Sequence, residues 1–309
     1  AMQGSGLALM AMSLTACGGS SSTTTATTTT TTTTTTVVAG VQKSLLSTTD
    51  LQTGGAGDDV FYGLNSGDFA TGDIVDGGAG ADKMIAAYTS GNGTTQAIRP
   101  VLSNLETIQL TITDGDTGGD TTTLNLDQST GVTNVVFGNK VFVGNADTIV
   151  LSGVTTAVAV TIQDDAGVAT NNANNYTLTY SDAATGTADT ASVAVKMTTA
   201  DGELGAITAA NVETLTVSAS GGFDASYALA ADSATTLTLN AAADSTAADT
   251  GVGTVVVTAA KVTKLNINAS NDLTVTDGGS LIKVSEVNID SAVTGKTVIM
   301  SALTTTATA

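Results

Sequence analysis

The chain has 309 residues, of which 28 are acidic and nine are basic, and it contains no His and one Cys. Without an imidazole and with a single thiol, it cannot form a Ser-His-Asp triad, a His-ligated metal site or an internal disulfide. Its formal net charge of -19 repels phosphate, so we expect no nucleic-acid partner. The composition leaves cation binding by Asp, catalysis by carboxylates alone, or a structural role.

A short apolar run and a cysteine mark the N-terminal segment. The run covers residues 7–12, and Leu14-Thr15-Ala16-Cys17 follows it. This tetrapeptide resembles the lipobox of bacterial lipoproteins, and the run is too short to span a bilayer. The resemblance implies that residues 1–17 are a signal-peptide remnant and that Cys17 is lipidated. The alternative is that Cys17 is a buried structural residue.

The next segment is built almost entirely from small polar residues. Residues 18–36 are Gly and Ser followed by nearly pure Thr. They cannot bury enough apolar surface to offset the entropy of ordering the chain. We predict a disordered linker over residues 18–44, which tethers a folded domain to the outer membrane through the lipid anchor.

Two nine-residue segments share the pattern Gly-Gly-x-Gly-x-Asp-x-apolar-x, at residues 54–62 and 77–85. Glycines permit backbone conformations in which carbonyl groups turn towards an ion, and each Asp adds a carboxylate. Calcium takes six to eight oxygen ligands of these kinds. We therefore predict a calcium-binding segment over residues 45–90, although ordinary Gly-Asp turns are the alternative.

The spacing of the acidic residues indicates candidate ligands. Asp68 lies nine residues after Asp59, so residues 63–68 are expected to form a degenerate middle turn in register with the first. Asp82 falls outside that register. We expect about one to three calcium ions. The candidate metal-binding residues are Gly55, Gly57, Asp59, Asp68, Asp73, Asp76, Gly78, Gly80 and Asp82.

Short alternating runs fill residues 91–309, which we predict to be a repetitive β-strand domain. A unit of the form apolar-x-x-apolar-polar-apolar recurs at residues 105–110, 212–217, 262–267 and 284–289. Alternation with period two indicates strands with one buried face. Regular recurrence indicates stacked coils, each buried against its neighbours. The predicted fold is all-β, a parallel β-solenoid or β-roll, with a β-sandwich as the alternative.

The calcium motifs and two repeated strand units together resemble a known family. Residues 71–82 are similar to the calcium-binding stretch of RTX-type bacterial surface-layer proteins, and residues 104–108 and 211–215 are similar to their strand units. The resemblance implies a protein that coats the bacterial cell, and whose folding and assembly are driven by calcium. It also implies that the partner is the protein itself, in a homo-oligomeric lattice or filament.

The sequence therefore predicts a non-enzymatic, calcium-binding structural protein at the bacterial cell surface. A calcium-dependent adhesin or carbohydrate-binding module that contacts surface polysaccharide shares the same sequence features. A polysaccharide-modifying enzyme with RTX repeats is the third alternative. Adjacent acids such as Asp164 and Asp165 would point to opposite faces of a strand, and aromatic residues make up only 3% of the chain. Both observations argue against a catalytic cleft.

Overall fold

A computed structural model gives the fold of most of the chain beyond residue 37. It describes residues 38–91, 95–114, 118–140, 146–164, 174–183, 188–197, 204–221, 226–242, 253–290 and 297–301. Cys17, the lipobox and most of the predicted linker lie outside these residues. Within them the chain forms 23 β-strands. None of these segments is a helix with the length and hydropathy needed to cross a membrane.

The strands form three sheets, of eleven, nine and three strands. The eleven-stranded sheet contains β1 (Gln42–Ser44), β3 (Val60–Gly63), β5 (Lys83–Ser90), β8 (Thr107–Asp114), β10 (Asn134–Lys140), β12 (Ala159–Asp164), β14 (Thr190–Met197), β16 (Thr214–Gly221), β18 (Thr236–Ala241), β20 (Lys264–Ala269) and β22 (Glu286–Asp290). The nine-stranded sheet contains β6 (Thr95–Ile98), β9 (Thr121–Asn125), β11 (Thr148–Val154), β13 (Asn175–Tyr180), β15 (Ala206–Ala210), β17 (Ser226–Ala230), β19 (Gly253–Thr258), β21 (Leu273–Asp277) and β23 (Val298–Ser301). The three-stranded sheet contains β2 (Leu51–Gly55), β4 (Ile74–Gly78) and β7 (Val101–Ser103).

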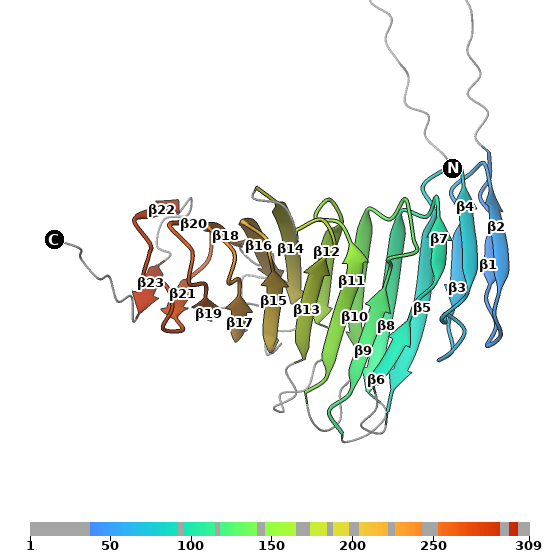
Figure 1. Ribbon diagram of the computed structural model, residues 1–309, viewed down its shortest axis with the longest axis horizontal. Helices are drawn as coiled ribbons and strands as arrows, with labels where there is room; N and C mark the ends of the chain where they lie inside the picture. The colour runs from blue at the N-terminus through green and yellow to red at the C-terminus, as the bar shows by residue number, and fades with distance from the viewer. Residues whose placement is uncertain are drawn as a thin grey trace, which may run out of the picture. The chain divides into compact units, whose positions relative to one another are not determined.

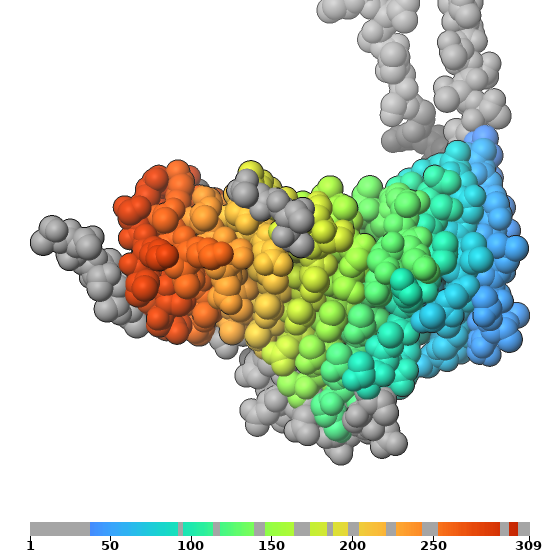
Figure 2. Space-filling model, in the orientation of Figure 1, coloured from blue at the N-terminus to red at the C-terminus, as the bar shows by residue number. Residues whose placement is uncertain are grey.

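Every strand pair in these sheets is parallel. Successive strands alternate between sheets, so the chain winds in coils that stack on one another (Figure 1). In the space-filling view the colours follow one another in bands from β1 to β23, as expected for such a stack (Figure 2). The predicted parallel β-solenoid is confirmed, and the β-sandwich alternative is wrong because a sandwich joins its strands in antiparallel pairs.

Two of the predicted domain boundaries fall inside this solenoid. Residues 42–44, at the end of the predicted linker, form β1 and pair with β3. Across the predicted boundary at residue 90, β5 pairs with β8 over eight residues. The glycine-rich segment and the following strands therefore belong to one continuous stack.

Apolar residues, most of them aliphatic, form continuous columns inside the stack. Along one column of the eleven-stranded sheet, Phe61, Met84 and Ile108 lie in register in successive coils, and all three are fully buried. The opposite sheet contributes residues such as Tyr176, whose ring centroid lies 5.9 Å from that of Phe137. Branched and small side chains suit this core because each position is a pleated, half-buried strand that packs against its neighbours in adjacent coils.

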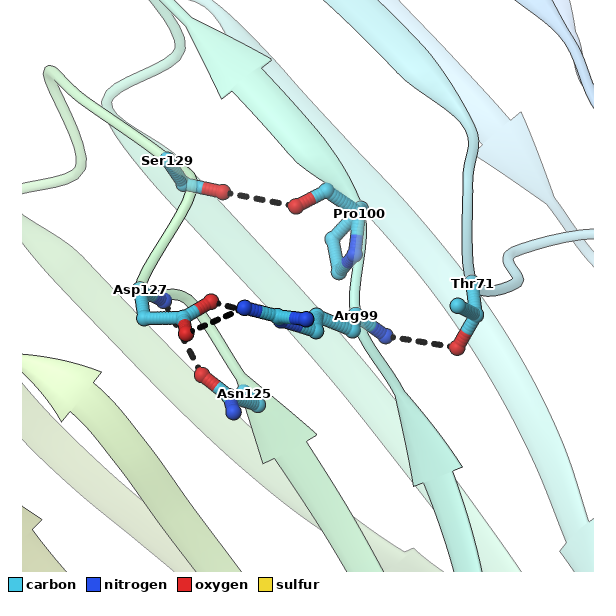
Figure 3. A network of polar contacts seen from close by, with 6 residues as sticks. All are labelled: Thr71, Arg99, Pro100, Asn125, Asp127 and Ser129. Carbon is cyan, nitrogen blue, oxygen red and sulfur yellow. Dashed lines mark hydrogen bonds and ion pairs between the residues drawn. The ribbon is translucent and has the colours of Figure 1, made fainter.

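The three-stranded sheet gives way to the nine-stranded sheet between β6 and β7, where Arg99 and Pro100 lie. Arg99 is the single arginine of the chain, and its guanidinium donates two hydrogen bonds to Asp127, of 2.8 and 2.6 Å (Figure 3). Its backbone N–H donates to Thr71 Oγ1, and Ser129 Oγ donates to the Pro100 carbonyl. These bonds connect three consecutive coils at the point where the cross-section changes.

Replacing Arg99 with Ala should weaken this junction slightly. The ion pair is bidentate, but both side chains are more than one third exposed, so water and salt screen it. We expect the melting temperature to fall by roughly 2 °C at low ionic strength and by less in 0.5 M salt. Thermal unfolding of wild type and variant in both buffers tests this. A loss that is equal at both salt concentrations would show that the guanidinium acts through packing instead.

Candidate calcium site at the glycine-rich corner

The two Gly-Gly-x-Gly-x-Asp segments lie directly on top of one another in adjacent coils. Gly55 pairs with Gly78, and the backbone N–H of Asp59 donates a 2.7 Å hydrogen bond to Asp82 Oδ1, 23 residues further along the chain. The expected nine-residue register between Asp59 and Asp68 is therefore wrong. A coil must supply a strand to two sheets and turn at each corner, so its repeat is much longer than nine residues, and Asp82 is the residue that stacks on Asp59.

Three acidic residues form what we call the carboxylate ladder: Asp59, Asp82 and Glu106. Each immediately precedes a strand of the eleven-stranded sheet, β3, β5 and β8. Each carboxylate accepts the backbone N–H of the corner residue one coil earlier: Val41 donates to Asp59, Asp59 to Asp82, and Asp82 to Glu106. The ladder thus satisfies corner N–H groups that the sheet hydrogen bonds do not reach.

Glycine is required at this corner because the backbones of adjacent coils nearly touch. A Cβ atom on Gly54 would overlap the carbonyl oxygen of Gly77, and one on Gly77 would overlap that of Asn104. Gly78 and Gly80 also have positive φ angles, of 95° and 142°, which side chains other than glycine rarely adopt. A Cβ atom on Gly78 or Gly80 would lie 2.2 or 2.6 Å from the carbonyl oxygen of Gly55 or Gly57, so carbonyls of the first segment also face the backbone of the second. Oxygen atoms from both segments gather between the two coils.

The remaining candidate ligands lie elsewhere in the coils. Asp73 precedes β4, and its carboxylate accepts the N–H groups of Asp50 and Ala70 at 3.0 and 2.7 Å. Asp68 accepts the N–H of Asn65 in its own turn, at 2.9 Å. Both Asp73 and Asp68 are buried, as is Asp50. These three acids form a second group at another corner of the coil.

Asp76 lies within β4, apart from both groups. Its Oδ1 accepts a hydrogen bond of 2.9 Å from the Asn104 side chain and one of 3.2 Å from the Gly78 N–H. These hydrogen bonds lower the pKa of Asp76, the one from Asn104 having the larger effect. Of the five predicted aspartate ligands, only Asp59 and Asp82 are thus brought together by the stacking of the two motifs.

Asp82 has an electrostatic environment unlike that of Asp59. Burial raises the pKa of Asp82, and the neighbouring carboxylates of Asp59, Glu106 and Asp58 raise it further. The pKa of Asp59 is lowered instead, mainly by hydrogen bonds from the backbone N–H groups of Val41 and Gly55. Asp82 Oδ2 is buried and accepts no hydrogen bond. A positive ion at this corner would compensate that oxygen and reduce the repulsion within the ladder.

The donor atoms of this corner suit a hard cation in chemical type. Carboxylate and backbone carbonyl oxygens are the ligands that calcium prefers. In the described part of the chain, no three acidic or cysteine side chains converge on a single point as the ligands of an ion would. An ion here would therefore depend on the carboxylates of Asp59 and Asp82 together with carbonyl groups of the glycine-rich turns.

Two residues of this corner, Asn104 and Glu106, were not among the predicted site residues. Asn104 adopts a left-handed conformation, with φ of 49°, and Leu105 is fully buried. Glu106 then accepts the Asp82 N–H. The same arrangement recurs where Asn211 has φ of 62° and Glu213 accepts the Asp189 N–H at 3.1 Å. The repeated Asn-apolar-Glu-Thr unit immediately before a strand was the signal that could have identified them.

Comparisons with known proteins add no relative. No protein-family model, no curated protein and no solved structure matches the chain.

The raised pKa values predict an unusual pH dependence. Burial is the main cause for both Asp73 and Asp82, so these carboxyls bind protons more readily in the folded state than in the unfolded state, whose value is near 3.8. Their contribution to stability is present at low pH and is lost as the pH rises through their folded pKa values. The lowered pKa values of Asp59 and Asp76 have the opposite effect. Their contribution to the stability of the folded state is present at neutral pH and is lost as the pH falls below about 4.

In calcium-free buffer we therefore expect the melting temperature to rise as the pH falls from about 7.5 towards the unfolded value near 4. Thermal unfolding over this range measures the effect. Reduced repulsion across the whole acidic chain contributes to the same trend. An Asp82→Asn variant separates the two causes, because it should show a weaker pH dependence than wild type. An identical pH profile for the two proteins would contradict the assigned role of Asp82.

Proposed function

We propose that this chain is a non-enzymatic, calcium-binding structural protein of the bacterial cell surface that acts by self-assembly. The observation that carries the proposal is the stacking of two glycine-rich motifs, which places Asp82 on Asp59 and leaves Asp82 Oδ2 buried without a hydrogen-bond donor. Calcium would supply positive charge between these two coils and would link them. The parallel solenoid is compatible with such a repetitive structural role.

Charge at the glycine-rich corner supports the choice of cation. Asp58, Asp59, Asp82 and Glu106 lie close enough for each of the other three to raise the pKa of Asp82. Lys43 is the cation whose charge lowers the pKa of Asp59. In the proposed site, Asp59 and Asp82 hold the ion, and Glu106 continues the ladder into the next coil. Binding would stabilise the folded state by mass action.

The hydrogen bonds of the acidic side chains support a structural role over a catalytic one. The ladder carboxylates accept backbone N–H groups, so their task is to hold coils together. A groove of about 280 Å³ beside β9 and β11 is lined by residues such as Leu126, Val132, Val154 and Val158, and none of its lining residues is ionisable. Its hydroxyl groups, on Ser129, Thr130 and Thr155, therefore have no acid or base among the lining residues to activate them.

Calcium titration of the whole chain tests the proposal. We expect millimolar calcium to raise the melting temperature above that in EGTA, and calorimetry to show binding. Asp82→Asn should weaken calcium binding by about tenfold or more. Asp232→Asn is the matched control, since Asp232 is an exposed acid in a distant coil, and it should bind as wild type does. Equal melting temperatures in EGTA and calcium, with no heat of binding, would overturn the proposal.

Electron microscopy tests the assembly part separately. Ordered sheets or filaments that form in calcium and dissolve in EGTA are the expected result. Dispersed particles that retain calcium and bind surface polysaccharide would instead identify a calcium-dependent adhesin. Loss of polysaccharide polymer length on incubation with the protein would indicate the enzyme alternative and contradict the structural role.

A further inference from the structure

The two ends of the described solenoid differ in the side chains that point inward. At the C-terminal end, Val287 and Ile289 of β22 lie in register with the buried Leu265 and Ile267 of β20. In every preceding coil of this sheet back to β3, such inward residues are covered from both sides. Here the described residues cover them from one side only, and Val287 and Ile289 remain 41% and 51% exposed.

The second strand of the last coil continues this apolar end. Val298 and Met300 of β23 lie in register with Leu273 and Val275, and both are only partly buried. Ile282, in the preceding turn, is 49% exposed. We call Ile282, Val287, Ile289, Val298 and Met300 the apolar end. Exposed aliphatic groups gathered in this way mark an interaction surface.

At the N-terminal end the exposed aliphatic residues, such as Val41, Leu46 and Leu51, lie in turns or on outward positions, whereas inward positions of the sheets are polar. Lys43 of β1 occupies the column of Phe61, and Gln52 of β2 occupies the column of Val75. Lys43 donates a hydrogen bond across the end of the coil to the Thr53 carbonyl. Inward-pointing charges on edge strands oppose further strand addition. The N-terminal end is thus a poor surface for stacking another coil.

Charge also distinguishes the ends. Residues 38–82 contain seven Asp and one Lys, whereas residues 261–290 contain four acids and three Lys. Two N-terminal ends would repel each other strongly. Two C-terminal ends carry nearly balanced charge, and Lys264 of β20 pairs with Glu286 of β22 at 2.8 Å. Two copies could meet through any pair of their ends. Only a pair of C-terminal ends combines an apolar surface with weak charge repulsion.

We propose that two copies of this chain associate through their apolar ends, in a two-fold symmetric, tail-to-tail dimer. A two-fold contact brings the same surface of each copy together, so Val287 and Ile289 of one copy would cover those of the other. The unpaired edges of β22 would meet across the axis and continue the sheet. This inference rests on the proposed self-assembly, for which it names one interface.

The arrangement has a cost that predicts its salt dependence. Glu286 and Asp290 lie on the outward side of β22 and would approach their counterparts in the second copy. Salt screens exposed like charges but does not weaken apolar contacts. We therefore expect the dimer to become tighter between 0.05 and about 0.5 M salt.

Mass measurement of the full chain by light scattering in EGTA tests the interface. Wild type should have twice the chain mass, and a Val287→Lys, Ile289→Lys variant should have the mass of one chain. The control is Ile74→Lys, because Ile74 is similarly exposed, at 44%, on the N-terminal three-stranded sheet. This control should remain dimeric. Circular dichroism is the control that all three proteins are folded. A wild-type monomer at tens of micromolar, or a dimeric double-lysine variant, would overturn the proposal.

Disulfide cross-linking tests the symmetry of the dimer. In a Cys17→Ser background, Asn288→Cys in β22 should form a disulfide with its own counterpart, while Gln42→Cys in β1 should not. A disulfide between two copies of the Gln42→Cys variant would contradict the tail-to-tail arrangement. So would a disulfide that forms only between Cys at position 42 and Cys at position 288 when the two variants are mixed. A dimer in EGTA that never forms larger assemblies in calcium would support this interface while refuting the proposed calcium-driven assembly.

Discussion

A Gly54→Ala variant should lose about 3 kcal/mol or more of unfolding free energy. A Cβ atom at this position would overlap the Gly77 carbonyl oxygen and the Asp59 carboxylate. The neighbouring coil cannot move away freely, because Gly77 itself lies against the carbonyl of Asn104. One methyl group therefore forces apart three coils that are stacked in register. Urea denaturation followed by circular dichroism measures the loss, which should appear in both EGTA and calcium.

Gly55→Ala is the matched control for this prediction. It adds the same methyl group one residue later, where the nearest atom, Asp59 Oδ2, would be 3.8 Å away. That distance is an ordinary van der Waals contact, and the substitution also restricts the unfolded chain. We expect a change within about 1 kcal/mol. Equal destabilisation by the two substitutions would show that the corner needs glycine for backbone flexibility and not for close approach.

Much of the fold follows from the sequence because each strand carries its own signal. The alternating burial of Leu237 and Leu239 in β18, or of Leu265 and Ile267 in β20, is visible as alternation of apolar and polar residues. Recurrence of such units predicted stacked parallel coils, and the structure has them. Local alternation is reliable because a shift of one residue would place every apolar side chain in water.

The length of the coil was not predictable from the same signals. Asp59 and Asp68 match a nine-residue repeat, yet Asp59 stacks on Asp82, 23 residues away. Other coils differ again, since Asn240 of β18 and Asn268 of β20 are hydrogen-bonded at a separation of 28 residues. Turns of variable length between strands leave no fixed period in the sequence. Residues at equivalent corners therefore cannot be aligned by counting.

The role of the acidic residues also required the three-dimensional structure. Motif spacing identified Asp59 and Asp82 as candidate ligands, and stacking brings them together. Spacing could not show that Asp59 accepts backbone N–H groups while Asp82 Oδ2 has no donor. In the first motif the Gly55 N–H donates to Asp59 Oδ2, whereas in the second motif the equivalent N–H, of Gly78, donates to Asp76. The sequence pattern is the same in both motifs, so the different partner of this one N–H group could not be predicted from it.

Phe137→Ala should destabilise the middle of the solenoid by about 3–5 kcal/mol. The Phe137 ring is fully buried between Leu110 and Ile162 of the adjacent coils, and it contacts Tyr176 of the opposite sheet. Its removal leaves a cavity bounded on several sides by sheet residues, which cannot collapse without breaking strand pairing. Phe137→Leu keeps most of the volume and should cost less than about 1.5 kcal/mol. Urea denaturation of both variants measures the difference.

The position of Phe137 makes this substitution a test of how the solenoid unfolds. Each coil contacts only its neighbours, so a weak coil separates the stack into two parts whose stabilities are nearly independent. Hydrogen exchange of Phe137→Ala should therefore speed up in β8, β10 and β12, while β18 and β20 keep wild-type protection. Uniform acceleration across all strands would instead mean that the stack unfolds as one cooperative unit. In that case the glycine-rich corner, two to three coils away from Phe137, would be stabilised by the entire core and not only by the coils beside it.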